Sequence, residues 1–338
     1  MSAISRPQRR LFKADETKLK TVLSKRTLTT LLLLLFALLM IIKPSFYLDS
    51  ARRGLSLFAG TVLPSMFPFY FCSIMLTKIG AAKTLSALFR RPMFALYRTP
   101  KESAYVMLLS MLSGYPVGAA CLKGLYSSGA ISTRDVRAIS AFASTSGPIF
   151  MLGTVGVAIF HNVLCGVVVL VSHYLAAFLN GFIYRLKASA PSQSVSSQTF
   201  DADKALGSAM SDTTLSMLLV GGYVVLAGML ADTLKLLNFD VFLLNTCGRA
   251  AQPILSLVIG AIEMTRGAIE CSKCAPLLSV PLATAVVSFG GLSVTLQTHS
   301  FLSACGMKTR EILLRKFTHS IIAFALALLL TLVLKNYF

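Results

Sequence analysis

Charged side chains are scarce in this sequence of 338 residues. They make up 13% of the chain, whereas hydrophobic residues make up 55%. Soluble domains carry about twice that share of charge, so the composition excludes an ordinary soluble protein. Residues 28–42 form an almost unbroken apolar run, and several later segments are long enough to cross a hydrocarbon core of about 30 Å. The composition therefore predicts an integral membrane protein that crosses the bilayer several times.

Acidic residues are scarcer still, with 13 Asp and Glu against 32 Lys and Arg, for a net charge of +19. A nucleic-acid-binding protein is one explanation of such a charge, but the placement of the basic residues argues against it. They cluster before the first apolar run and in the connections near residues 78–101, 185–187 and 308–316. This placement is typical of cytoplasmic loops that contact anionic lipid headgroups. We expect a cell-membrane protein with a cytoplasmic N-terminus, in contact with membrane lipids and not with nucleic acid.

Several chemical motifs are missing. The sequence contains no nucleophile–His–Asp arrangement, dinucleotide fingerprint or phosphate-binding loop, which argues against an enzyme and against an ATP-driven pump. Cys271 and Cys274 have the spacing of half a zinc site, but no second pair or histidine cluster accompanies them. We therefore expect no enzyme activity, no cofactor and no metal site.

The most informative segment that is present is a helix breaker inside apolar sequence, at residues 113–118. Two glycines and a proline in six residues leave backbone N–H and C=O groups unpaired in a helix. In hydrocarbon each such group costs several kcal/mol, so broken backbone persists only where protein surrounds it or where water and ligand reach it. Secondary transporters build their substrate sites from such segments.

The charge placement predicts an all-α polytopic membrane protein made of two inverted repeats. Each repeat contains a span, a re-entrant helical hairpin and a broken transmembrane helix, and the second repeat enters from the opposite face. The expected spans lie near residues 27–47, 54–76, 163–184, 212–230 and 317–334, with a loop at Arg52 and Arg53. The chain then divides into a basic cytoplasmic segment (1–26), a first transmembrane helix (27–50), a first repeat (51–187), a serine-rich cytoplasmic linker (188–206) and a second repeat with the last helix (207–338).

Glu263 and Arg266 are the ionisable residues of the second broken segment. Intramembrane charge is costly, so each is a candidate for function. One hypothesis is that Arg266 holds a substrate carboxylate while Glu263 binds a cation, carries a proton or accepts hydrogen bonds from the ligand. The alternative is an ion pair between the two, which the i, i+3 spacing allows on a helix.

The other interruptions offer neutral groups. A helix that restarts after Gly114 or Pro116 presents N–H groups and a positive dipole end, which suit an anion. The alternatives are hydroxyls bonded to their own helix and glycines that serve close helix packing. The candidate substrate-binding set comprises Ser113, Gly114, Tyr115, Pro116, Gly118, Ser144, Thr145, Ser146, Glu263, Arg266, Gly290, Gly291, Ser293 and Gln297.

Several of these motifs resemble the YlbJ family of sporulation membrane proteins, which belongs to the nucleoside-recognition, or Gate, domain proteins. The resemblance rests on the motifs SGYPVGA (113–119), FASTSGP (142–148), GAIEMTRG (260–267) and FGGLSV (289–294) with Gln297, and on LPSMFPF (63–69). It covers the chain from about Leu55 to the last helix, in the family's order.

The resemblance implies a fold like the core of concentrative nucleoside transporters. It also implies transport of dipicolinic acid toward the forespore, across the outer forespore membrane of a sporulating cell. The alternatives are a transporter of a nucleoside or another small metabolite with the same fold, and a membrane scaffold that transports nothing. A homo-oligomer is compatible with each of them.

Overall fold

The computed structural model describes residues 25–80, 86–87, 89–185 and 202–334. These residues are helices, turns and loops, and no strand occurs among them. Two compact units are present, residues 1–52 and 53–338, and each is described by itself. The first contains helix α2 (Lys25–Ile42) and the beginning of α3 (Pro44–Leu57).

The first predicted helix ends earlier than expected, because α2 stops at Ile42 and not near Tyr47. Pro44 explains the break, since proline has no N–H to donate and disfavours a helical residue before it. The expected loop at Arg52 and Arg53 is wrong, because both arginines lie inside α3. That helix continues through a π-helical turn, η1 (Phe58–Val62), into α4 (Leu63–Lys78).

Five helices of the described residues are long and apolar enough to cross a membrane. They span Pro44–Lys78, Val163–Ile183, Ala205–Leu236, Pro276–Cys305 and Thr309–Val333. The shorter α2 is not among them, so the transmembrane role of residues 27–50 stays a prediction. Most of the predicted linker lies outside the described residues, and helix α11 begins at Ala202.

The larger unit repeats one order of elements. In each half a long helix is followed by a short helix, a two-helix hairpin, an interrupted segment and another long helix. The first half contains α4, α6 (Arg90–Tyr97), α7 (Glu102–Ser113), α8 (Val117–Ser127), α9 (Thr133–Ile139), η2 (Phe150–Ile159) and α10 (Val163–Ile183). The second contains α11 (Ala202–Leu236), α12 (Phe239–Cys247), η3 (Gly248–Ala250), α13 (Ala251–Ile262), α14 (Met264–Cys271), α15 (Pro276–Phe289), α16 (Gly291–Leu302), η4 (Ser303–Cys305) and α17 (Thr309–Val333).

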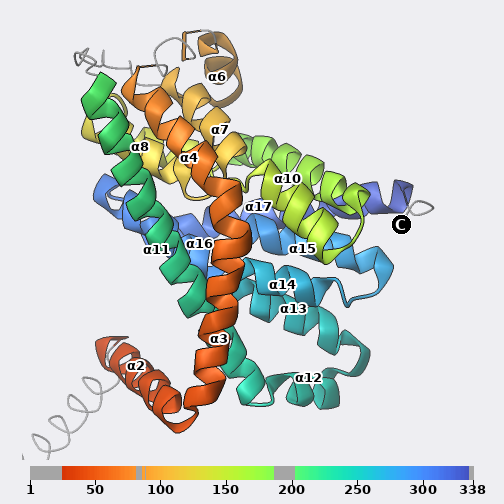
Figure 1. The fold of residues 1–338 in the computed structure, drawn as a ribbon. Helices are drawn as coiled ribbons and strands as arrows, with labels where there is room; N and C mark the ends of the chain where they lie inside the picture. Colours follow the sequence, from red (N-terminus) through yellow and green to blue (C-terminus); the bar gives the residue numbers. More distant parts are fainter. Residues whose placement is uncertain (1–24, 81–85, 88, 186–201, 335–338) are drawn as a thin grey trace, which may run out of the picture. The chain divides into compact units, whose positions relative to one another are not determined.

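Elements at equivalent places in this order pack on each other. Helix α4 lies against α11, and α10 lies against α17 (Figure 1). The short helices α6 and α12 occupy opposite ends of the larger unit in the same view. The inverted orientation of the two repeats stays a prediction, because an order of elements does not fix the two faces of a membrane.

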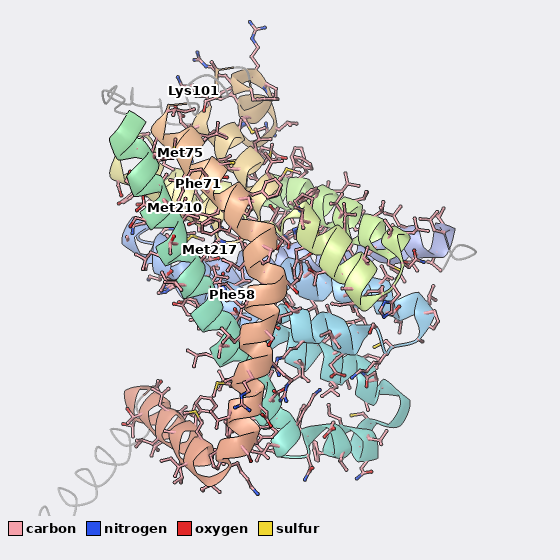
Figure 2. The ribbon with its side chains drawn as sticks, viewed as in Figure 1. Phe58, Phe71, Met75, Lys101, Met210 and Met217 are labelled. Atoms are coloured by element: carbon pink, nitrogen blue, oxygen red, sulfur yellow. The ribbon has the colours of Figure 1, made fainter. Side chains whose placement is uncertain are left out.

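The packing of α4 on α11 shows how the apolar sequence is divided between core and surface. Phe58 and Met217 are buried in one cluster where η1 meets α11 (Figure 2). On the outer side of α11, Leu215 and Leu218 are each 63% exposed. Exposed leucines recur along the long helices, which is expected of a surface that faces lipid and not water.

Candidate functional site

The break between α7 and α8 packs directly on the irregular segment that follows α9. Gly114 has φ of 80°, and a Cβ there would lie 2.6 Å from the backbone nitrogen of Gly147. A Cβ on Gly118 would overlap the carbonyl oxygen of Ala143. Glycine is needed at both positions because another residue would separate the two segments.

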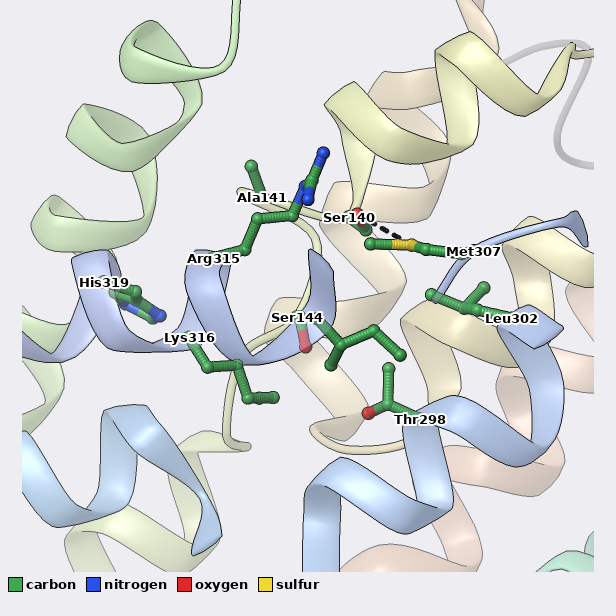
Figure 3. Close-up of a pocket in the computed structure, with 10 residues that line it drawn as sticks. Ser140, Ala141, Ser144, Thr298, Leu302, Met307, Arg315, Lys316 and His319 are labelled. Carbon is green, nitrogen blue, oxygen red and sulfur yellow. Dashed lines mark hydrogen bonds between the residues drawn. The ribbon is translucent and has the colours of Figure 1, made fainter. Parts of the chain in front are cut away.

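The segment 144–147 has no regular structure, and its backbone is bonded by side chains of other helices. The Thr145 N–H donates to Ser110 Oγ at 3.2 Å, and the Ser146 N–H donates to His173 Nε2 at 2.9 Å. These bonds supply the partners that an interrupted helix needs in a membrane. Ser144 lines a small separate cavity next to Lys316 and Thr298 (Figure 3).

The second hairpin breaks at Glu263, whose buried side chain caps helix α14. Its Oε1 accepts a hydrogen bond from the Thr265 N–H at 3.1 Å, and its Oε2 accepts one from the Arg266 N–H at 2.8 Å. A carboxylate at a helix N-terminus satisfies free N–H groups and complements the helix dipole. Behind it, Gly267 lies directly on Gly260, so the two arms of this hairpin also meet through glycine.

The fourth interruption separates α15 from α16. Gly290 and Gly291 have φ of 78° and 70°, and a Cβ on Gly291 would lie 2.8 Å from the Gly260 carbonyl oxygen. Each hairpin break is therefore packed on the interrupted segment of its own half. After the break, Gln297 Nε2 donates to Ser293 Oγ at 3.1 Å.

All four interruptions contribute to one cavity, which we call the central cavity. Its volume is about 30 Å³, enough for about two water molecules. Of the predicted set, Ser113, Tyr115, Ser146, Glu263, Ser293 and Gln297 line it. The lining does not include the other predicted residues, which are Gly114, Pro116, Gly118, Ser144, Thr145, Arg266, Gly290 and Gly291. It does include Ser65, Gly147 and Thr265, and an apolar wall of Val62, Met66, Leu112, Phe150, Val220, Val224, Met264 and Val294.

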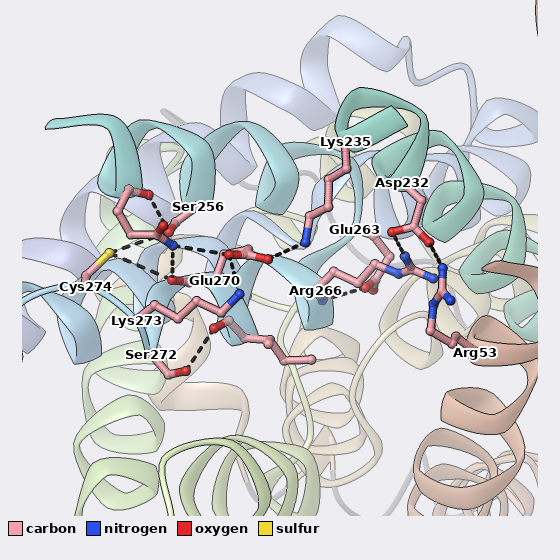
Figure 4. A network of polar contacts seen from close by, with 12 residues as sticks. Arg53, Asp232, Lys235, Ser256, Glu263, Arg266, Glu270, Ser272, Lys273 and Cys274 are labelled. Atoms are coloured by element: carbon pink, nitrogen blue, oxygen red, sulfur yellow. Dashed lines mark hydrogen bonds and ion pairs between the residues drawn. The ribbon is translucent and has the colours of Figure 1, made fainter. Parts of the chain in front are cut away.

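Arg266 points its guanidinium away from this cavity, toward α11. There it pairs with Asp232, whose other oxygen accepts from Arg53 at 2.8 Å (Figure 4). The Asp232 side chain is 9% exposed and that of Arg266 15%, so the pair is largely removed from water. Asp232 is not in the predicted set, because a partner on a distant helix leaves no signal in local spacing.

Two histidines that are not in the predicted set connect the interruptions. His173 Nε2 accepts from Ser146, so the neutral ring carries its proton on Nδ1 and donates to Ser288 Oγ at 2.7 Å. His319 Nε2 then donates to the His173 carbonyl oxygen at 2.9 Å. Their position inside long apolar runs was the available signal, since ionisable residues at membrane depth are uncommon.

Lys316 lies in a different place from the one that the sequence predicts. Its expected position was a basic cytoplasmic loop at residues 308–316. Helix α17 instead begins at Thr309, and Lys316 lies two turns inside it with 3% exposure. The charge rule assigns lysines to loops, so it cannot identify a lysine that a fold buries.

Five membrane-length helices and the absence of strands among the described residues define a polytopic all-α membrane protein. No family model matches the chain, and no solved structure matches it. A curated relative does: the chain is 24% identical over 318 residues to the sporulation integral membrane protein YlbJ of Bacillus subtilis (strain 168), which covers 85% of this chain and 78% of the relative. This similarity supports the YlbJ-type resemblance that the motifs indicated.

Proposed function

We propose that this protein is a secondary transporter of a small anionic metabolite, and that it works by alternating access around the central cavity. The observation that carries the proposal is the convergence of four backbone interruptions on one cavity that holds polar side chains, between the long helices. Broken backbone at membrane depth is maintained where it binds a ligand or lines a path. No step of bond chemistry is part of the proposal.

The small size of the cavity supports a mechanism with moving parts. A volume of about 30 Å³ is far below the several hundred Å³ that a small-molecule site occupies. Substrate therefore enters only when a hairpin moves away from the other elements. At Gly114 and Gly291 the backbones of the hairpin and of the interrupted segment meet with no side chain between them, which suits such a movement.

The proposed substrate is dipicolinic acid, a planar dianion that is moved toward the forespore during sporulation. The YlbJ-type resemblance implies this cargo, and the relative's name supports a role in sporulation. Hydroxyls at Ser113 and Ser293 line the central cavity and are donors suited to carboxylates. The same proposal places the protein in the outer forespore membrane, with a cytoplasmic N-terminus and a Gate-type repeat.

Deletion of the gene in its sporulating host tests the function. Spores of the deletion strain should lack dipicolinic acid while the mother cell still synthesises it, and the wild-type gene should restore it. A Glu263→Gln variant, which changes a residue that lines the central cavity, should fail to do so at equal protein level. Normal dipicolinic acid in deletion spores would exclude this substrate, and uptake of a nucleoside by purified protein in vesicles would favour the alternative cargo.

A further inference from the structure

The second cavity, which we call the basic cavity, contains the buried side-chain nitrogen of a lysine. It is lined by Ser140, Ala141, Ser144, Thr298, Leu302, Met307, Ile312, Arg315, Lys316 and His319. Among the described residues, Lys316 Nζ has no hydrogen-bond partner, and it stands 3.8 Å from the centre of the Tyr115 ring. A cation over an aromatic face is stabilised by about 1–2 kcal/mol, which does not replace the hydration that burial removes.

A second group in the same cavity also has no partner. Thr298 Oγ1 is buried and makes no hydrogen bond to any described residue. Figure 3 shows the Lys316, Ser144 and Thr298 side chains converging on one space. Unsatisfied buried polar groups are rare in folded proteins, and two of them in one cavity indicate that an acceptor belongs there.

The remaining charges of the cavity favour an anion. Arg315 adds a positive charge, and its Nε and one terminal nitrogen donate to the carbonyl oxygens of Arg137 and Glu311 at 2.7 Å and 2.8 Å. None of the described residues in the lining is acidic. An anionic ligand would supply both an acceptor for Lys316 Nζ and a counter-charge for its protonated form.

We propose that the basic cavity is the carboxylate subsite of the transporter, and that Lys316 and Thr298 bind one carboxylate of the substrate. This proposal rests on the transport function proposed above. The Tyr115 ring contacts Lys316 and also lines the central cavity, so it separates the basic cavity from the cavity that holds Glu263. The division assigns the substrate anion to Lys316 and leaves Glu263 for a coupling proton or cation. Arg266, which pairs with Asp232, is then not a substrate ligand.

The subsite is small in this conformation. Its space is about 10 Å³, which holds about one water molecule and no carboxylate. Binding therefore requires α17 and the segment 140–147 to move away from each other. A single trapped water that satisfies Lys316 is the competing explanation, and it predicts no dependence of ligand affinity on Lys316.

Binding of dipicolinate to purified full-length protein in lipid nanodiscs tests the proposal. Lys316→Met should weaken binding about thirtyfold or more, because it removes a buried charged partner of the ligand. Lys316→Arg should retain part of the affinity, and Thr298→Val should weaken binding by less than Lys316→Met. Arg310→Gln, which removes an exposed charge from the first turn of the same helix, should leave binding unchanged.

The melting temperature without ligand separates this proposal from a structural role. Lys316→Met should melt at the same temperature as the wild type or higher, because a buried charge without an acceptor is removed. Lower stability with unchanged dipicolinate affinity would overturn the proposal, and so would an unchanged affinity alone. If the wild-type protein neither binds nor transports dipicolinate, the proposed function fails. If the wild-type protein transports dipicolinate and the Lys316→Met variant does so equally well, only the proposed subsite fails.

Discussion

At the scale of single residues, the buried charges are explained by partners that lie far away in the sequence. Arg266 was a candidate ligand because it is charged and adjacent to a break, yet its guanidinium pairs with Asp232 on α11. Glu263 uses both oxygens to cap α14 and also lines the central cavity. The two residues therefore have different surroundings, and substitutions at them should have different consequences.

Asp232→Asn should destabilise the protein by about 3 kcal/mol, because it leaves the largely buried Arg266 without this carboxylate. Adding Arg266→Gln should cost little more, since the buried charge has then been removed. Melting temperatures of the two single variants and the double variant in detergent measure this coupling. Additive shifts would show that the two side chains act independently.

Glu270 provides a pH-dependent contribution to stability. Its carboxylate accepts from Lys235 Nζ at 2.6 Å and from Lys273 Nζ at 2.8 Å. Burial raises the pKa of this carboxyl, but the hydrogen bonds from Lys235, Lys273 and Gln252 outweigh it, so the pKa lies below its ordinary value of 4.5. A lowered pKa in the folded state stabilises the protein above the ordinary value, and this stabilisation is lost as the pH falls through the folded value.

We expect Glu270→Gln to cost about 1 kcal/mol at neutral pH, because solvent screens the two half-exposed lysines. The difference in melting temperature between wild type and variant should be constant from pH 7 to about pH 5. It should then narrow as the pH falls below 4.5. A difference that stays constant down to pH 3 would contradict the assignment.

At the scale of elements, glycine contacts hold each hairpin on the interrupted segment of its own half. Gly118→Ala should destabilise the protein by about 3 kcal/mol, since the new methyl group overlaps the Ala143 carbonyl oxygen and forces α8 away. Gly124→Ala is the matched control in the same helix, because nothing lies within 4 Å of its Cβ position. It should be neutral or stabilise by up to about 1 kcal/mol.

Gly118→Ala should have a lower melting temperature and weaker dipicolinate binding than Gly124→Ala. Equal effects of Gly118→Ala and Gly124→Ala would show that helix propensity, and not close packing, determines the role of glycine in α8. The equivalent position in the second half is Gly267, where alanine would overlap Gly260. Gly267→Ala should therefore resemble Gly118→Ala.

The interruptions themselves were predictable, because glycine and proline inside apolar runs have one physical consequence in a membrane. The helices of membrane length were predictable for the same reason. Two features were not. The charge rule placed Arg53 and Lys316 in loops, whereas the fold pairs the first with Asp232 and buries the second. The hydrogen bonds of His173 to Ser146 and Ser288 connect residues 27 and 115 positions apart, and such pairings depend on packing that no local pattern encodes.

At the scale of the whole molecule, the two halves share one order of elements, and α6 and α12 lie at opposite ends of the larger unit (Figure 1). If the repeats are inverted, the residues that follow the hairpin of the first half and those that precede the hairpin of the second face opposite sides of the membrane. Ser128, which is exposed after α8, and Asn238, which is exposed before α12, report on these two places.

Single cysteines at these positions, in a cysteine-free background expressed in vegetative cells, test the topology. A membrane-impermeant maleimide should label Asn238→Cys in intact cells and Ser128→Cys only after permeabilisation. This asymmetry follows from the basic residues that surround the first hairpin, since positive charge is retained on the cytoplasmic side. Labelling of both cysteines from outside would overturn the inverted repeat. The reverse asymmetry would preserve the repeat but place the N-terminus outside. Substrate would then reach the basic cavity from the opposite side of the membrane.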